Sequence, residues 1–576
     1  MKKEKRVWTI VLIVLGSLAP NLTNAQQDSI QTFDLDEVVI TATKFPKSRS
    51  ETGKVITVID SDVLQRSAGM ELSQLLNEQV GLVINGSGSN PGKDKSVYLR
   101  GAKSEYTLFL IDGIPVSDPS GAGGAFDPRM FSLDQLERIE ILKGSQSTLY
   151  GSDAIAGVIN LITKKGGDKP FGGSATMSYG SFDMLKANVS VQGTTSLADY
   201  HVGLGHTSTT GISEAKDLNN TGDFDKDGFD QNTLNVSAGF KLIPSLTVTP
   251  FFRYTDFDSE FDGGSFTDDN STYTSTLINP GLSSQFKFSK GAINLLYGHN
   301  RTDRKFDGPF GPTEYKGRFD NADLFFNYDL GDRIQLLTGI NYQNQKMIDA
   351  SLAIEEPEAQ LVSPYVSLFL HNVGGLAVEL GGRYNHHSKY GSNSTFSFNP
   401  SYKINHSTKL FFNYSSGFKA PTLQQLYGAF GANEDLKPEK SLSLEAGLDV
   451  ITSNRLETRL TFFSRNVDDV IVYTFTNGNI NMNQQNDFGF ELEPTFKVND
   501  RVIVKAYYSL VDGEVTTQEN GKDSTYFNLL RRPKHTIGLN VGVQATSRLY
   551  LSLKGKTFSG RKDLFFNPDN FFIAEQ

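Results

Sequence analysis

The sequence predicts a mainly β protein: a roughly 22-stranded transmembrane β-barrel, with about 19 strands present here, and an N-terminal α+β plug domain inside it. Two observations predict the barrel. Segments of alternating apolar and polar residues recur from Gly172 onward, and their connections alternate between short turns and long polar loops. That order is typical of outer-membrane barrels, which have tight turns on one side and long loops on the other. A third observation, a mixed α and β pattern before Gly166, predicts the smaller domain.

Residues 1–25 have the pattern of a secretory signal peptide. Basic residues precede the apolar run Val7–Leu15, and small residues stand at a cleavage site after Ala25. An uncleaved membrane-anchoring helix is the alternative. No later apolar run is long enough to cross a bilayer as a helix. The sequence therefore predicts an exported protein, either periplasmic, secreted or in the outer membrane.

Composition excludes several classes of protein. The chain of 576 residues has no cysteine, so it has no disulfide, no thiolate metal site and no lipoprotein cysteine. The net charge of −10 argues against nucleic acid as a partner. Phe and Tyr are abundant, while the one Trp, Trp8, lies in the signal segment. Phe and Tyr must then supply the aromatic girdles at the two surfaces of the membrane.

Residues 26–45 form a separate N-terminal segment. It is polar up to a short β-prone run, Glu37–Thr43, which has no obvious local partner in the sequence. One interpretation is the first strand of the following domain. The other is an exposed strand to which a partner protein adds a strand of its own.

Residues 46–166 predict a compact domain that ends near Gly166-Gly167. The expected elements are strands at Val55–Ile59, Val97–Arg100 and Thr107–Ile111 and a helix over Ser61–Asn77.

The most distinctive stretch is Leu136–Thr163, LERIEILKGSQSTLYGSDAIAGVINLIT. Two β-rich runs, Ile139–Leu142 and Val158–Ile162, flank a glycine-containing segment. We expect two strands that meet at turns requiring the backbone freedom of glycine.

Residues 167–576 predict the barrel. The final residues, FFIAEQ, follow a strand and a loop, so the sequence predicts that the C-terminal strands are missing. A closed bacterial barrel has an even strand count, and an open one would leave two unpaired edges in lipid.

Two neighbouring loops are rich in aspartate. The motif DFDKDG at 223–228 places three carboxylates two residues apart, and the next long loop carries Asp262, Asp268 and Asp269. Hard oxygen ligands at this spacing suit Ca²⁺, and carboxylates so crowded would repel without a cation. An EF-hand is unsuitable, because Leu234 occupies the place of its bidentate acid. A solvated acidic loop is the alternative.

No catalytic constellation stands out. The sequence has no GxxxxGK[ST] phosphate loop and no HExxH pattern, and its eight His residues are scattered. We therefore expect a protein that is not an enzyme.

The signal peptide, DEVVITATK, the small domain and the long barrel together resemble TonB-dependent outer-membrane receptors. Leu136–Thr163 is similar to the plug signature of that family, and LIDGIPV at Leu110–Val116 is another plug hallmark. The resemblance implies that the N-terminal run is the TonB box, made of Glu37, Val38, Val39, Ile40, Thr41, Ala42 and Thr43.

Within that family the chain looks most like the cobalamin receptors. The resemblance lies in Gly417–Ser441, in LLRRPKH at Leu529–His535 and in the two acidic loops. It implies calcium ions that order the loops, with a further ligand near Ser213. The implied calcium ligands are Asp223, Asp225, Asp227, Asp262 and Asp269. The implied corrinoid contacts are Asp94, Ser96, Lys103, Gly121, Ala122, Arg531 and Phe566.

The resemblance further implies active uptake of cobalamin or another corrinoid across the Gram-negative outer membrane. A TonB-type protein in the periplasm would pair with the TonB box and transmit energy from the inner-membrane proton gradient. Outer-membrane lipid would surround the barrel. The sequence does not decide whether a surface lipoprotein caps it. The alternatives are a siderophore or haem receptor of the same family, and a passive porin or surface adhesin, which would need neither TonB box nor plug.

Overall fold

The computed structural model describes residues 38–217, 222, 224–309, 311–349, 352, 354, 356–474, 477–519, 522–527, 530–567 and 570–575. The signal segment, residues 26–36, Glu37 of the TonB box and the predicted calcium ligand Asp223 lie outside these residues.

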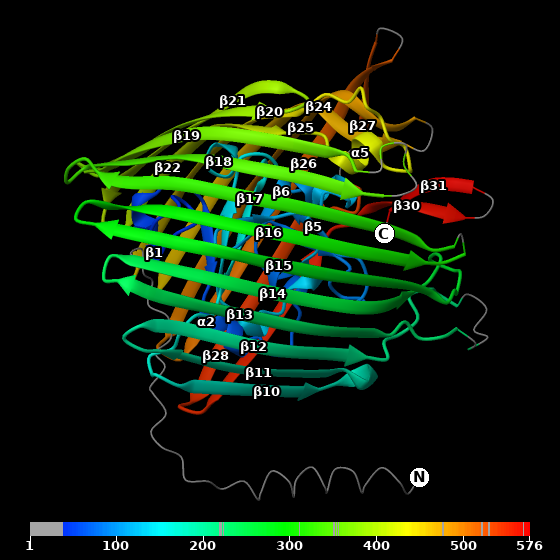
Figure 1. Ribbon diagram of the computed structural model, residues 1–576, viewed down its shortest axis with the longest axis horizontal. Helices are drawn as coiled ribbons and strands as arrows, with labels where there is room; N and C mark the ends of the chain where they lie inside the picture. Colours follow the sequence, from blue (N-terminus) through cyan, green and yellow to red (C-terminus); the bar gives the residue numbers. More distant parts are fainter. Residues whose placement is uncertain are drawn as a thin grey trace, which may run out of the picture.

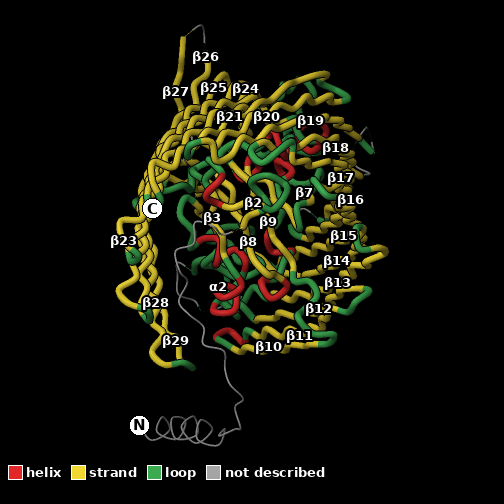
Figure 2. Tube along the Cα trace, turned by 90° about the vertical axis from the view of Figure 1, so that its left-hand side faces the viewer, coloured by secondary structure: helices red, strands yellow, loops and turns green. Residues whose placement is uncertain are grey.

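A 20-stranded antiparallel sheet curves around a small inner domain (Figures 1 and 2). Except at β27, each strand pairs with the next along the chain, as in an up-and-down barrel. The strands are β10 (Gly172–Tyr179), β11 (Leu185–Thr194), β12 (Ala198–Thr209), β13 (Phe229–Ile243), β14 (Leu246–Phe261), β15 (Ser271–Phe288), β16 (Gly291–Asp307), β17 (Thr313–Asp329), β18 (Ile334–Ile348), β19 (Glu358–Val373), β20 (Leu376–His387), β21 (Gly391–Asn405), β22 (Thr408–Lys419), β23 (Glu439–Ser453), β24 (Leu456–Thr474), β25 (Gly478–Asn499), β26 (Val502–Glu519), β27 (Lys522–Phe527), β28 (His535–Thr546) and β29 (Leu549–Phe558).

The strand pattern confirms the predicted mainly β fold. β27 pairs only with the outer end of β26, whose inner part pairs with β28, so β27 extends a loop beyond the wall. A separate hairpin of β30 (Lys562–Asn567) and β31 (Asn570–Glu575) follows the last wall strand. One helix, α5 (Leu423–Tyr427), lies in a long loop at the same end of the barrel (Figure 1).

The two faces of the wall have opposite polarity. On β20, Leu380 and Tyr384 are exposed on the outside, whereas Glu379, Arg383 and Asn385 are buried on the inside. Side chains of a strand point alternately to its two faces, so one sequence pattern produces both surfaces. An apolar outer face with a polar interior is what a barrel in lipid requires. None of the described helices is long and apolar enough to span a bilayer.

The inner domain contains a five-stranded sheet in the order β3-β8-β9-β6-β7, a two-stranded ribbon β4–β5 and a short pair β1–β2. Its strands are β1 (Val38–Val39), β2 (Lys47–Ser48), β3 (Ile56–Ile59), β4 (Leu82–Asn85), β5 (Ser96–Leu99), β6 (Thr107–Ile111), β7 (Ile114–Val116), β8 (Leu136–Lys143) and β9 (Gly157–Thr163). Its helices are α2 (Ser61–Arg66), α3 (Leu72–Asn77) and α4 (Ser147–Tyr150). Figure 2 shows this domain within the ring of strands.

The Leu136–Thr163 stretch contains the central strands of this sheet. β8 and β9 pair antiparallel, and β9 also pairs in parallel with β6, so the predicted strands are confirmed. Every residue of β9 is buried. The segment between them forms the short helix α4, which the sequence did not predict.

The expected single helix over Ser61–Asn77 was wrong. Gly69, in the left-handed region with a φ of 88°, separates α2 from α3. Each half has its own N-terminal cap: the Asp60 carboxylate accepts from the Val63 N–H, and Glu71 and Gln74 form a reciprocal capping box.

A buried ion cluster joins the inner domain to the wall. The Arg100 guanidinium contacts the carboxylates of Glu445 and Glu491, and the Lys143 ammonium lies 3.1 Å from Glu491. At most 4 % of any of these side chains is exposed. Buried charges are stable only when paired, so this cluster fixes the domain against β23 and β25.

Two glycines permit this close approach. A Cβ atom at Gly81 would lie 2.0 Å from Glu491 Oε1, and one at Gly144 would lie 2.4 Å from Glu445 Oε1. Both residues also have a positive φ, 73° and 79° respectively, which disfavours any other residue.

Candidate functional site

An outer cavity of about 520 Å³ lies between the inner domain and the long loops. Its volume falls in the range of small-molecule sites. Lys103, Glu105, Ala122 and Gly123 line it from the inner domain. The remaining lining residues come from the barrel side and include Phe430, Tyr473, Gln485 and Arg532.

This outer cavity combines aromatic and charged side chains. Phe430 and Tyr473 are exposed and offer ring faces to a ligand. The Lys103 ammonium donates to Glu439, at 2.9 Å, and to the Ile471 carbonyl. Burial alone would lower the pKa of Lys103, but the carboxylates of Glu439 and Glu105 outweigh it and raise the pKa. Lys103 therefore stays positively charged beside the cavity.

The predicted substrate contacts divide into two groups. Lys103 and Ala122 line the outer cavity. The other described candidates lie elsewhere: Asp94 pairs with Arg129 at 3.2 Å, Ser96 lies in β5 opposite Asn85, Gly121 is buried in a turn after Asp118, and Arg531 pairs with Asp563 at 2.7 Å. Phe566 belongs to β30, and its side chain lies outside the described part of the structure.

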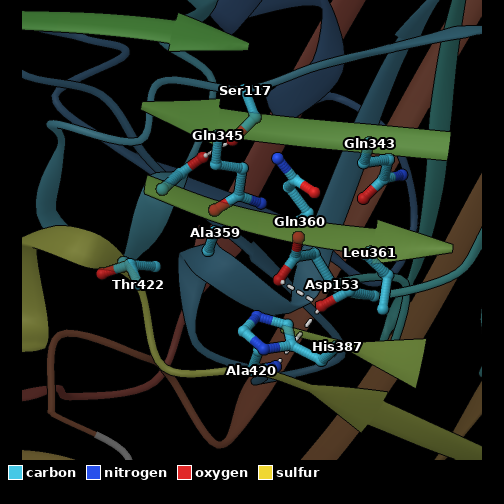
Figure 3. Close-up of a pocket in the computed structure, with 13 residues that line it drawn as sticks. Ser117, Asp153, Gln343, Gln345, Ala359, Gln360, Leu361, His387, Ala420 and Thr422 are labelled. Carbon is cyan, nitrogen blue, oxygen red and sulfur yellow. Dashed lines mark hydrogen bonds between the residues drawn. The ribbon is translucent and has the colours of Figure 1, made fainter. Parts of the chain in front are cut away.

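A second pocket beside the outer cavity is too small for a cargo. Its volume is about 20 Å³, which is enough for about one water molecule. Figure 3 shows Asp153 and His387 among the polar side chains that line it. The Lys419 ammonium contacts Asp153 at 2.6 Å, so this pocket belongs to the packing between the inner domain and β22.

The two acidic loops converge in space. Carboxylate oxygens of Asp225, Asp262 and Asp268 all lie within 4.8 Å of one another. Asp262 is held in place, because its Oδ2 accepts a hydrogen bond from Ser213 Oγ at 3.0 Å and its Oδ1 accepts from the Asp269 N–H. Asp268 was missing from the predicted ligands, whereas Asp269 Oδ1 instead accepts a hydrogen bond from Ser271.

The electrostatics of the acidic loops indicate crowded negative charge. The pKa of the Asp227 carboxyl is raised to about 7, and burial is the largest cause. The Asp262 carboxylate also acts to raise this pKa, whereas the hydrogen bond from the Glu214 N–H acts to lower it. Burial and the carboxylates of Asp268 and Asp262 raise the pKa of Asp225 as well. A divalent cation would relieve this repulsion, and carboxylate oxygens are the ligands that Ca²⁺ prefers.

The predicted TonB box is docked rather than free. The described part of the box is a two-residue strand, β1, followed by a turn, and β1 pairs with β2. The expectation that this run has no local partner was therefore wrong. Thr41, Ala42 and Thr43 are fully buried, while Val38 remains exposed.

One carboxylate of the plug signature holds the TonB box. Glu140 Oε2 accepts hydrogen bonds from the Ile40 N–H at 3.0 Å, the Thr41 N–H at 2.8 Å and Thr41 Oγ1 at 2.6 Å. Tyr150 donates to the Thr41 carbonyl at 2.8 Å. Because these backbone groups are occupied, a partner strand can pair with the box only after it leaves this position.

We expect Glu140→Gln to loosen the box by about 1–2 kcal/mol, the difference between charged and neutral hydrogen bonds. A spin label on Val38→Cys would report greater mobility in this variant, and the cysteine-free background makes that label unique. Glu137→Gln is the matched control, because Glu137 is exposed on the same strand. Equal label mobility in the two variants would contradict the role of Glu140.

A barrel with an internal domain, a loop-covered outer cavity and a docked N-terminal segment defines a gated outer-membrane receptor. A model of the TonB-dependent receptor plug domain matches residues 48–158, and one of the TonB-dependent receptor-like β-barrel matches residues 172–573. The chain belongs to the TonB-dependent receptors, a family of outer-membrane transport proteins in Gram-negative bacteria. The inner domain is the plug.

Solved structures share this fold at low sequence identity. The siderophore receptor PirA from Acinetobacter baumannii superposes with a TM-score of 0.74 at 19% identity, covering 90% of this chain and 87% of that one. A ferric enterobactin receptor (PfeA) mutant from Pseudomonas aeruginosa gives 0.74 at 19% identity, covering 92% and 88%. FpvA from P. aeruginosa, bound to a pyoverdine, gives 0.75 at 15% identity, covering 94% and 80%.

Proposed function

We propose that this receptor takes up a corrinoid, and that calcium bound by the acidic loops orders its binding site. The observation that carries this proposal is the convergence of Asp225, Asp262 and Asp268. The residues fit a calcium ion, since three carboxylates, with Asp227 nearby, supply several of the six to eight oxygens that Ca²⁺ takes. The sequence resemblance to cobalamin receptors supports the same cargo.

Energy for uptake would come from the inner-membrane proton gradient through a TonB-type protein. Two features support this step: the sequence at Glu37–Thr43 resembles a TonB box, and its backbone groups are held by contacts that can be exchanged for a partner strand. Cargo binding at the outer cavity would shift the plug toward a state in which the box is released.

A ferric siderophore is the second candidate cargo. The solved structures named above include a siderophore receptor and a ferric enterobactin receptor, and this likeness supports a siderophore as cargo. The outer cavity adds chemical support, since Lys103 and Arg532 with Phe430 and Tyr473 suit an anionic ligand with aromatic rings.

Titration of the purified full chain separates the two candidates. Cyanocobalamin and ferric enterobactin would each be titrated in Ca²⁺ and in a calcium chelator. We expect tight binding of cyanocobalamin only with Ca²⁺. Binding of ferric enterobactin without any effect of Ca²⁺ would instead favour the siderophore.

Asp262→Asn tests the calcium ligands. This substitution should weaken Ca²⁺ affinity by at least roughly 10–100-fold. That is the loss of metal affinity found when a residue that only supports a direct ligand is removed. Asp332→Asn is the matched control, because Asp332 is an exposed carboxylate in a short turn at the opposite end of the barrel. Equal Ca²⁺ affinity in the two variants would contradict the proposed site.

A further inference from the structure

Three cavities succeed one another along β26, where the plug faces the wall. Val515 lines the outer cavity of about 520 Å³. Further down the strand, Val511 and Ser509 line a middle cavity of only about 10 Å³, here called the neck. Tyr507 and Lys505 line an inner cavity of about 690 Å³ near the short turns. One strand therefore passes two large spaces and the constriction between them.

The neighbouring strands place the neck at the same height. Ser509 pairs with Glu491 of β25 and with Thr536 of β28, and Thr536 also lines the neck. Below this row, Thr495 of β25 and Asn540 of β28 line the inner cavity. The wall strands at the neck are thus β26 and β28, while β24 and β25 line both larger cavities and β29 lines the inner one.

The inner cavity has a mixed lining. Lys505, Lys556, Glu78 and Glu493 contribute charged groups of both signs, and apolar side chains such as Leu539 line it as well. Its volume, like that of the outer cavity, lies in the range of small-molecule sites.

The plug side of the neck is the ribbon β4–β5. Val83 and Tyr98 face each other across this ribbon in the strand register, and both line the neck. Among the described strands, β4 and β5 pair only with each other and not with the five-stranded plug sheet. The ribbon can therefore shift without breaking the strand pairing of the rest of the plug.

Arg532 covers the neck from the outside. It lines both the outer cavity and the neck. Its guanidinium donates to the Gly101 carbonyl and lies 5.1 Å from the centre of the Tyr98 ring. A single side chain thus links the β27–β28 loop to the plug ribbon at the top of the constriction.

We propose that cargo crosses the barrel between the ribbon β4–β5 and the wall strands β26 and β28, from the outer to the inner cavity through this neck. The proposal rests on the proposed transport function. Displacement of the ribbon, together with release of the Arg532 contacts and of the adjoining Arg100 ion pairs with Glu445 and Glu491, opens the neck. The five-stranded plug sheet stays in place during this step.

Thiol labelling in whole cells tests the route. The chain has no cysteine, so Ser509→Cys carries a unique thiol, and Ser509 is only 3% exposed. Labelling by a membrane-impermeant maleimide would be measured with cyanocobalamin and ferric enterobactin present, with and without the TonB-type protein. We expect labelling to rise severalfold only when that protein is present.

Ser367→Cys is the matched control. Ser367 is a fully buried serine of β19 that lies near a plug-facing glycine, Gly381, and away from the three cavities. Its labelling should not change. Equal labelling at the two positions, or greater labelling at Ser367, would overturn the proposed route.

Ser509→Trp provides a second readout, because its side chain would fill the neck. This variant should bind cargo like the unsubstituted chain but take it up severalfold more slowly, whereas Ser367→Trp should slow uptake less. Normal uptake by Ser509→Trp would contradict the route. Lack of uptake by the unsubstituted chain would instead contradict the proposed function, and the labelling comparison would still decide the route.

Discussion

Arg100→Met should weaken the attachment of the plug to the barrel by about 3–5 kcal/mol, the usual cost of breaking a buried ion pair. Glu445 and Glu491 would then lose the cation that they share. Lys143 would remain near Glu491, at 3.1 Å, and uncharged Asn413 would still donate to Glu445 at 2.9 Å. One buried negative charge would therefore lack a counter-charge.

Conductance of the receptor in a planar bilayer during a urea titration measures this effect. Channels should open at a lower urea concentration in Arg100→Met, because a loosened plug no longer blocks the lumen. Arg301→Met is the control, since Arg301 pairs with Asp303 on the outside with 42% of its side chain exposed. Exposed pairs contribute only about 0–1 kcal/mol, so this variant should behave like the unsubstituted chain.

Deletion of Glu37–Thr43 should abolish uptake while leaving cargo binding intact. The deleted residues include the segment that a TonB-type protein would pair with, but none of the described ones, residues 38–43, lines the outer cavity. Uptake of labelled cargo by cells and equilibrium binding to the purified receptor separate the two effects.

An equally long deletion of Gln26–Thr32 is the control for shortening the N-terminal segment, and it should retain uptake. If the variant that lacks Glu37–Thr43 still accumulated cargo, the assignment of the TonB box would be wrong. If it lost binding as well, the segment would have a structural role in the plug instead.

The fold could be predicted because its pattern is local. Alternation along strands such as β20 and the alternating lengths of the connections are properties of neighbouring residues. The break between α2 and α3 was missed, because leucines on both sides continue the helical spacing across Gly69. The ribbon β4–β5 was only half predicted: a strand was expected at β5 but not at β4, although both have four residues.

The site was less predictable, because it is assembled from distant segments. Lys103, Phe430, Tyr473 and Arg532 meet at the outer cavity through the closure of the barrel, which no local pattern describes. The acidic loops could be found from composition. Which of Asp268 and Asp269 faces Asp225 depends on the local turn, and the spacing of the aspartates does not encode it.

The glycines at 81 and 144 have a consequence for how such a receptor diversifies. Any larger residue there would collide with Glu491 or Glu445, so these two positions tolerate almost no substitution. The long outer loops are free of that restriction. We therefore expect receptors that descend from one ancestor to acquire different cargoes through substitutions in their outer loops. The contacts between plug and barrel at these two glycines should stay nearly unchanged.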